Sequence, residues 1–225
     1  MLSGFKAGDR LSESQAKEIL KAYGIPATRQ FPAKSPEEAV QRALTLGFPV
    51  ALKIDSPDIP HKTEAGGVVL DIDSPEKVRE AFNSVTAGAR KYKPDARVNG
   101  VLVQEMLEKG TEVITGISRD ASFGPVIMFG LGGIFVEALE DVSLRVAPLN
   151  EGDAREMVRE IKGHKVLSGA RGNPPADEEA VVDILLKLSE LATDFPQIAE
   201  LDLNPLLVYE KGRGACAADA LIIID

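Results

Sequence analysis

Two basic side chains before residue 62 have the types and spacing that phosphate chemistry requires. Lys53 lies in the apolar run Val50–Ile54, and burying an ammonium is costly unless an anion meets it. His61 follows in a polar stretch that ends in Gly66 and Gly67. A neutral imidazole is a good nucleophile, and paired glycines let backbone amides approach an anion. The stretch is therefore a candidate phosphate site, although a solvated strand face and a surface turn explain each residue taken singly.

Oxygen ligands gather near the end of the chain. Asp202 and Asn204 precede a predicted strand, and Asp219 lies in the apolar run Ala217–Leu221, which we expect to be its antiparallel partner. Mg²⁺ prefers one or two carboxylates completed by nucleotide phosphates. Turn formation at strand ends is the alternative interpretation, and the position of Asp219 inside an apolar run favours the metal.

A predicted strand, Val101–Met106, is followed by Lys109–Glu112, a pattern typical of a hinge between two lobes. Backbone groups at such a strand end can bond an adenine edge, and a carboxylate just beyond can accept hydrogen bonds from ribose hydroxyls. An ordinary strand and turn is equally compatible with the composition.

Three further features carry weaker signals. Arg145 alternates with apolar neighbours, so it is either a surface residue or a partner for a terminal phosphate. The glycine-rich run Phe129–Gly133 lacks the Lys-Ser/Thr of a P-loop and the third glycine of a dinucleotide fingerprint, so neither fold is supported. His164 follows a predicted helix end, where a cation is favourable, and we assign it no catalysis.

The composition limits the class of protein. The chain has 225 residues, 44% of them hydrophobic and 27% charged, which is typical of a soluble globular protein. A net charge of −9 argues against a nucleic-acid surface. No apolar run is long enough for a membrane span or a signal peptide. Cys216 is the only cysteine, so no internal disulfide can form, and we expect a cytoplasmic location.

Periodicity and capping signals predict the elements that would position these residues. Ser35-Pro-Glu and Ser74-Pro-Glu are typical helix starts. The predicted helices are 12–23, 35–47, 75–92, 153–162 and 177–193, and the predicted strands are 27–31, 49–54, 68–72, 100–106, 112–118, 125–129, 143–147, 203–209 and 215–223. The sequence therefore predicts an α/β protein with two α+β lobes, residues 1–107 and 108–225, meeting near residue 107.

Taken together, these segments resemble the small β subunit of archaeal-type ADP-forming acetyl-CoA synthetases, in the superfamily that includes succinyl-CoA synthetase. The matching segments cover the whole chain: Leu11–Lys17, Tyr23–Pro26, Pro49–Lys53, Ile59–Val68, Phe129–Gly133, Gly169–Gly172 and Leu201–Leu206. Each is weak alone, but His61-Lys-Thr-Glu-Ala-Gly-Gly67 followed by Leu201-Asp-Leu-Asn-Pro205 is specific.

The resemblance implies an ATP-grasp fold, with ATP or ADP held between two lobes. The implied contacts are Lys53 with the phosphates, Glu105 and Met106 with adenine, Glu112 with ribose, Arg145 with the terminal phosphate, Asn204 and Asp219 with Mg²⁺, and Asp202 near the transferred group. His61 would carry phosphoryl from a separate α subunit, which binds CoA and the acyl group, to ADP. The implied assembly is α2β2, and the implied reaction is acyl-CoA + ADP + phosphate ⇌ acid + CoA + ATP.

Two other functions fit parts of the same pattern. A stand-alone ATP-grasp ligase that joins a carboxylate to an amine would need no loop histidine, so His61→Ala would leave it active. A non-catalytic nucleotide-binding regulatory module is the other alternative, and the presence of Lys53, Asn204 and Asp219 together argues against it.

Overall fold

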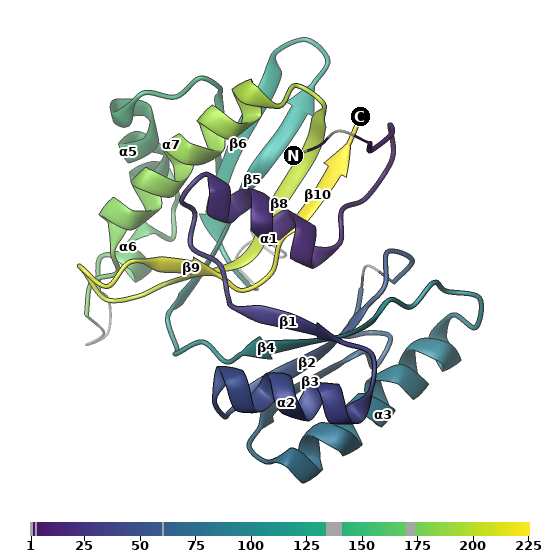
Figure 1. The fold of residues 1–225 in the computed structure, drawn as a ribbon. Coiled ribbons are helices and arrows are strands. Elements are labelled where there is room, and N and C mark those ends of the chain that lie inside the picture. The colour runs from purple at the N-terminus through teal and green to yellow at the C-terminus, as the bar shows by residue number, and fades with distance from the viewer. Residues whose placement is uncertain (1, 3, 60, 134–140, 170–173) are drawn as a thin grey trace. The chain divides into compact units, whose positions relative to one another are not determined.

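The computed structural model describes residues 2, 4–59, 61–133, 141–169 and 174–225. The chain forms two compact units (Figure 1). The larger unit contains Met1–Ala27 and Lys109–Asp225, and the smaller unit is the continuous segment Thr28–Glu108.

The smaller unit is a four-stranded antiparallel sheet with two helices on one face. Its strands are β1 (Gln30–Ala33), β2 (Val50–Asp55), β3 (Val68–Ile72) and β4 (Gly100–Glu105), in the order β1-β4-β2-β3, and its helices are α2 (Pro36–Leu46) and α3 (Pro75–Tyr92). Ser35 and Ser74 cap the two helices, each with a proline in the first turn. Leu52, Ile54 and Val103 share one apolar core with the buried sides of both helices.

The larger unit is built on a six-stranded antiparallel sheet. Its strands are β5 (Thr111–Asp120), β6 (Gly124–Leu131), β7 (Val142–Val146), β8 (Ile198–Val208), β9 (Ala215–Ala217) and β10 (Leu221–Ile224), in the order β10-β8-β5-β6-β7 with β9 paired to β8. Its described helices are α1 (Glu13–Ala22), α5 (Glu151–Glu160), α6 (His164–Leu167) and α7 (Glu178–Asp194). Residues of α1, α5 and α7 share a single core with the sheet.

Strand register divides this sheet into two faces, because directly paired residues project to the same side. One row runs Arg145, Ile127, Ile117, Leu201 and Ile222 across the sheet, and its four apolar members lie in the core with the helices. The next row runs Leu144, Met128, Gly116, Asp202 and Leu221. We call the side that carries this second row the outer face.

The division of the chain differs from the expected lobes 1–107 and 108–225. The first 27 residues belong with the larger unit, because α1 buries Ala16 and Leu20 in its core. The backbone before α1 also pairs with β10, where the amide of Leu11 donates to the carbonyl oxygen of Ile222 at 3.0 Å. The smaller unit is therefore an insertion between two segments of the larger one.

Most predicted elements are present, with four differences larger than two residues. The strand expected at 203–209 begins already at Ile198, so Asp202 lies inside β8 rather than before a strand. The first strand begins at Gln30 rather than residue 27, and the short helix α6 was not predicted. The expected strand 215–223 is two strands, and Asp219 lies in the link between them rather than within a strand. No helix among the described residues has the length and apolar character needed to cross a membrane.

Candidate functional site

The segment that carries His61 is anchored in the core on either side of an exposed tip. Ile59 and Ala65 are buried in the core of the smaller unit, whereas His61 is exposed. Turn hydrogen bonds join the amide of Ala65 to the carbonyl of His61 at 3.2 Å and the amide of Gly67 to that of Lys62 at 2.7 Å. Pro60 lies outside the described residues. The imidazole is thus presented to solvent between two fixed points.

An ion pair fixes the N-terminal side of this segment. Asp58 accepts from the Arg97 amide at 2.7 Å and from two guanidinium nitrogens at 3.1 and 3.0 Å. These hydrogen bonds lower the pKa of Asp58 to about 2. Ser56 adds a bond from its hydroxyl to the Arg97 carbonyl at 2.7 Å. No local pattern indicates a role for Arg97, because its partner lies 39 residues away.

Glycines fix the C-terminal side. A Cβ at Gly67 would lie 2.6 Å from the Ile54 side chain, and a Cβ at Gly88 of α3 would lie 2.7 Å from the Gly66 carbonyl oxygen. Gly66 itself has a φ of 62°, in the left-handed region. The predicted glycines thus let the segment return to β3 against strand and helix. Gly88 could not be identified from the sequence, because a single glycine within a helix does not reveal which segment packs against it.

Lys53 lies on β2 with only 8% of its surface exposed. Its neighbours Leu52 and Ile54 point into the helix-covered core, so strand alternation directs Lys53 to the opposite face of the four-stranded sheet. It is paired there with Val68 and Leu102. The structure therefore places an ammonium in a buried position on the strand that leads to the His61 segment.

Glu105 ends β4 and is held by Arg29. Its carboxylate accepts from the Arg29 amide and from Arg29 Nε, both at 2.6 Å, and its own amide donates to the Arg29 carbonyl. Glu105 pairs with Val50, so its side chain lies on the opposite face of the sheet from Lys53. Met106, which follows it, is partly exposed. Arg29 was not singled out from the sequence, because nothing there indicates that residue 29 lies beside residue 105.

Carboxylates converge on the outer face of the larger unit. Asp202 is paired with Leu221 and Gly116, and its Oδ1 is buried without a hydrogen-bond partner. Burial, with the negative charges of Glu200 and Asp219, raises the pKa of Asp202 to about 6. The structure therefore brings Asp202 and Asp219 together, although Asp219 lies in the link after β9.

This arrangement fits a magnesium site completed by a ligand. Asn204 is exposed two residues beyond Asp202, where the register of β8 with β5 shifts. Among the described residues, no three His, Cys, Asp or Glu side chains are grouped to hold a metal alone. A buried oxygen without a partner, beside a second carboxylate and an amide, is a donor set that suits Mg²⁺ sharing a nucleotide's phosphates. The predicted ligands Asn204 and Asp219 have the right chemistry for that role.

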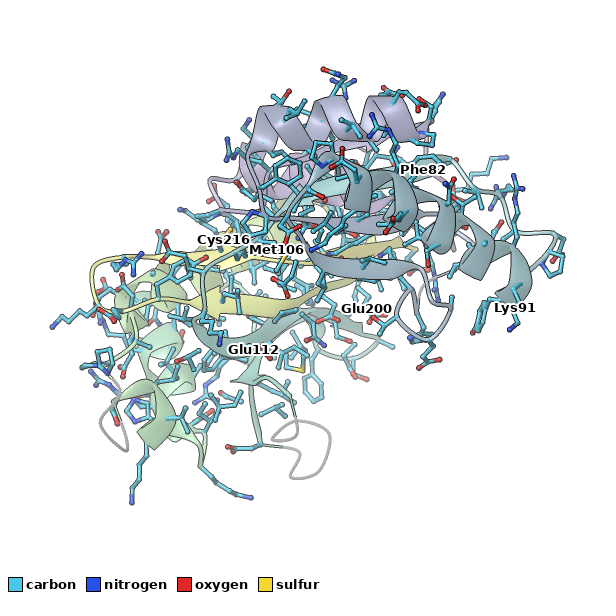
Figure 2. The ribbon with its side chains drawn as sticks, turned by 90° about the horizontal axis from the view of Figure 1, so that it is seen from below. Phe82, Lys91, Met106, Glu112, Glu200 and Cys216 are labelled. Atoms are coloured by element: carbon cyan, nitrogen blue, oxygen red, sulfur yellow. The ribbon has the colours of Figure 1, made fainter. Side chains whose placement is uncertain are left out.

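Glu112 also belongs to the outer face, because it alternates with the core residue Val113 on β5. Its side chain is exposed, and its carbonyl oxygen accepts from the Gly132 amide at 2.9 Å. Glu112 and Glu200 are labelled on their strands in Figure 2. The structure thus places the predicted ribose contact on the same side of the sheet as Asp202.

Arg145 differs from the expectation that it joins these residues. It pairs with the core residue Ile127, so its side chain lies on the helix-covered face. Its two terminal nitrogens each lie 2.7 Å from a carboxylate oxygen of Glu160 on α5. This bidentate pair raises the pKa of Arg145, and Ser143 donates to the same carboxylate. The apolar neighbours Leu144 and Val146 are the residues on the outer face, 53% and 48% exposed.

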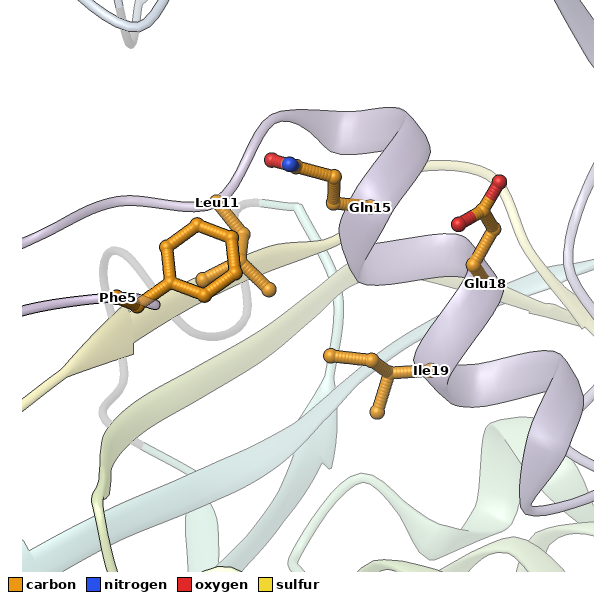
Figure 3. A pocket seen from close by; sticks show the side chains of 5 residues that line it. All are labelled: Phe5, Leu11, Gln15, Glu18 and Ile19. Atoms are coloured by element: carbon orange, nitrogen blue, oxygen red, sulfur yellow. The ribbon is translucent and has the colours of Figure 1, made fainter. Parts of the chain in front are cut away.

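A separate pocket of about 280 Å³ lies beside α1 (Figure 3). It is lined by Phe5, Leu11, Gln15, Glu18 and Ile19, and the last three occupy one side of the helix. None of the predicted site residues lines it. The motif at 169–172 extends into 170–173, which lie outside the described residues.

Comparison with known proteins agrees with this fold. Residues 6–224 match the family model described as an ATP-grasp domain. A structure of acetyl-CoA synthetase 1 from Ca. Korarchaeum cryptofilum, in complex with coenzyme A and Ca-AMPCP, superposes with a TM-score of 0.94 at 46% identity, over 96% of this chain and 94% of that one. The fold and site therefore define an ATP-grasp protein.

Curated relatives narrow the class. The β subunit of ADP-forming acetate–CoA ligase I from Pyrococcus furiosus is 52% identical over 220 residues, which cover 97% of this chain and 94% of that subunit. The chain belongs to the family of β subunits of ADP-forming acetate–CoA ligases. Another structure of the Korarchaeum enzyme, with Mg-AMPPCP, has a TM-score of 0.84 at 43% identity over 96% of this chain and 93% of that one, and its phosphohistidine segment points towards the nucleotide-binding site.

Proposed function

We propose that this chain is the nucleotide-binding subunit of an ADP-forming acyl-CoA synthetase, in which His61 transfers phosphoryl between a partner subunit and ADP. The implied overall reaction is acyl-CoA + ADP + phosphate ⇌ acid + CoA + ATP. The observation that carries the proposal is an exposed histidine held between two buried anchors, Ile59 and Ala65. A residue that must receive a group from one protein and deliver it to a nucleotide needs exposure and a fixed tether.

The transfer step requires only the chain's own nucleophile and the nucleotide. A ring nitrogen of His61 holds the phosphoryl group as a phosphoramidate. An oxygen of the ADP terminal phosphate attacks that phosphorus, the P–N bond breaks as the P–O bond forms, and the ring takes up one proton, so that neutral imidazole and ATP result. In such transfers proteins mainly supply positioning and charge stabilisation.

The remaining residues would bind and orient the nucleotide. We assign Lys53 and the amides of Gly66 and Gly67 to the phosphates, the strand end at Glu105 and Met106 to adenine, and Glu112 to ribose. Asn204 and Asp219 would hold Mg²⁺, with Asp202 near the transferred group. Mg²⁺ would supply neutralisation of phosphate charge.

The reaction also needs a partner. Two Pyrococcus furiosus relatives are named as β subunits, which implies an α subunit, and we propose that it binds CoA and the acyl group in an α2β2 assembly. No nucleic acid or membrane has a role in this scheme. A chain with a single cysteine is compatible with the cytoplasm, where we place the reaction.

The test combines this chain with a candidate α subunit, acetyl-CoA, phosphate and ADP, and measures ATP formation. His61→Ala should abolish ATP formation while leaving the affinity for Mg-ADP unchanged, because the imidazole carries phosphoryl and does not hold the nucleotide. His164→Ala is the matched control, since the chain has only two histidines, and it should remain active. Undiminished turnover in His61→Ala would instead favour a stand-alone ligase.

A further inference from the structure

Glu13 and Lys17 form a buried ion pair one turn apart on α1. Lys17 Nζ lies 2.8 Å from Glu13 Oε1, and the two side chains are only 2% and 5% exposed. Taking two charges out of water commonly costs as much as their attraction returns, and an apolar pair of similar size is often as stable or more so. A buried pair of this kind is therefore weak evidence for a stabilising role.

Lys17 reaches the segment that carries Asp219. Its Nζ donates a second hydrogen bond to the Ala218 carbonyl oxygen at 3.0 Å. The Ala218 amide in turn donates to the Pro205 carbonyl oxygen at 3.0 Å. Because Ala218 precedes Asp219 and Pro205 follows Asn204, one chain of hydrogen bonds starts at Lys17 and reaches the neighbours of both proposed magnesium ligands.

We propose that Lys17 is a positioning residue for the magnesium site, with Glu13 holding its ammonium in place. The inference rests on the proposed function, which makes Asn204 and Asp219 ligands. Asp219 lies in the link Ala218–Ala220, which strand pairing does not fix because β9 ends at Ala217 and β10 begins at Leu221. The hydrogen bond from Lys17 fixes the peptide that leads into Asp219.

The ion pair suits this role electrostatically. Ligand-orienting groups outside the first coordination sphere govern metal affinity through geometry. A lone buried ammonium beside the site would also repel Mg²⁺, but the Glu13 carboxylate neutralises it. Lys17 can therefore hold the Ala218 carbonyl without adding net positive charge to the site.

The test replaces both members of the pair, because a single change would leave one buried charge without its partner. Glu13→Leu with Lys17→Met keeps the volume and removes the hydrogen bond to Ala218. The matched control is Asp183→Leu with Lys187→Met on α7. Lys187 Nζ makes the same two contacts, 2.6 Å to Asp183 four residues earlier and 2.9 Å to the Gly24 carbonyl oxygen, away from both proposed ligands in sequence and bonding.

Binding of ADP to each variant is measured by calorimetry in EDTA and across a Mg²⁺ series, with the melting temperature recorded for each. We expect the Glu13/Lys17 variant to need about 10-fold more Mg²⁺ for half of the metal-dependent gain in ADP affinity. Its affinity for ADP in EDTA and its melting temperature should stay near those of the wild type. The Asp183/Lys187 variant should keep the wild-type Mg²⁺ dependence.

Two outcomes would overturn the positioning role: an unchanged Mg²⁺ dependence in the Glu13/Lys17 variant, or a large fall in its melting temperature with ADP binding lost equally with and without metal. The second outcome would mean that the Glu13–Lys17 pair mainly stabilises the fold. Failure of the proposed function would look different, because the wild-type chain itself would then show no Mg²⁺-dependent gain in ADP affinity or would form no ATP with its α subunit.

Discussion

Arg145 and Asp202 lie on opposite faces of the same six-stranded sheet. Arg145 shares its row with Ile127 and the helix-covered core, whereas Asp202 shares its row with Leu144 and Gly116 on the outer face. In a pleated strand, a shift of one residue moves a side chain to the other face. A ligand bound at Asp202 would therefore meet Leu144 and Val146 on β7 before it met the arginine between them.

Arg145→Met should leave the affinities for Mg-ADP and Mg-ATP within about threefold of the wild type. The guanidinium is already bound to Glu160, and losing a partly exposed pair worth up to about 1 kcal/mol should lower the melting temperature by roughly 2–4 °C. Lys53→Met is the contrasting variant, with an expected loss of about 10- to 100-fold for a charge-assisted phosphate contact. A selective loss of ATP affinity in Arg145→Met would show that the arginine exchanges Glu160 for the nucleotide.

Gly88→Ala should destabilise the chain although alanine favours helices. The gain in helix propensity is about 1 kcal/mol at most, whereas overpacking costs about 1–3 kcal/mol. The new Cβ would meet the Ala65 carbonyl oxygen at 2.9 Å and that of Gly66 at 2.7 Å. We expect a lower urea midpoint and slower phosphorylation of His61 by the partner subunit. Ser84→Ala, at an exposed position on the same helix, should be neutral or slightly stabilising; equal behaviour of the two variants would refute the contact.

Asp202→Asn should stabilise the metal-free chain at pH 7 and weaken its use of Mg-nucleotide. The folded-state pKa of Asp202 is raised to about 6 from 3.8 by burial, Glu200 and Asp219. Because the raised group is an acid, the wild type loses stability as the pH rises from about 4 to about 6. The shift corresponds to up to roughly 3 kcal/mol above that window.

The measurement for this variant is urea unfolding in EDTA from pH 4 to pH 7. The stability gain of Asp202→Asn should be largest at pH 7 and absent near pH 4. A gain that does not change with pH would mean that the carboxyl carries no such charge penalty. The variant would then gain stability and lose function, which is the usual trade-off at a site where like charges are held together to bind a ligand.

The Tyr23 hydroxyl should ionise at a higher pH than an ordinary tyrosine. Its hydroxyl donates to Asp194 Oδ2 at 2.6 Å, and burial together with this carboxylate raises the pKa of Tyr23 to about 12. The Tyr23–Asp194 hydrogen bond stabilises the folded chain fully below pH 10. This contribution is lost as the pH rises towards 12, because only the neutral phenol donates. Tyrosinate absorbance should show a component near pH 12 that moves down in Asp194→Asn. Tyr92→Phe, which removes an exposed tyrosine, should leave that component in place.

The sequence predicted a helix or strand well where the signals for it lie within that element. The serine cap and first-turn proline located α3 at Pro75–Tyr92, and apolar content located β3 at Val68–Ile72. The family resemblance supplied the ATP-grasp fold, which the comparisons confirm. The helix predicted at 12–23 is also present, as Glu13–Ala22 with Ser12 as its cap, but nothing local indicates that it packs with residues more than a hundred positions later.

The sequence predicted which residues belong to the candidate site, but not how they are arranged in space. Oxygen ligands near Asp202 and a histidine ahead of two adjacent glycines are visible in the sequence, whereas the face on which a strand residue projects depends on register with its neighbours. An extra residue on β8, where Val113 pairs with Leu206 but Thr115 with Leu203, is one such unpredictable shift. The supporting residues Arg29, Arg97 and Gly88 were missed for a related reason, since each acts on a partner that is distant in sequence.

The insertion of Thr28–Glu108 into the larger unit has a consequence for biosynthesis. The smaller unit is continuous and complete once residue 108 has left the ribosome, so it can fold while translation continues. The larger unit must wait for β10, because the earliest backbone of the chain, at Gly8 and Leu11, bonds to Ile224 and Ile222. The nascent chain therefore carries a finished smaller unit beside an unclosed sheet, and we expect limited proteolysis of stalled chains to recover the former intact.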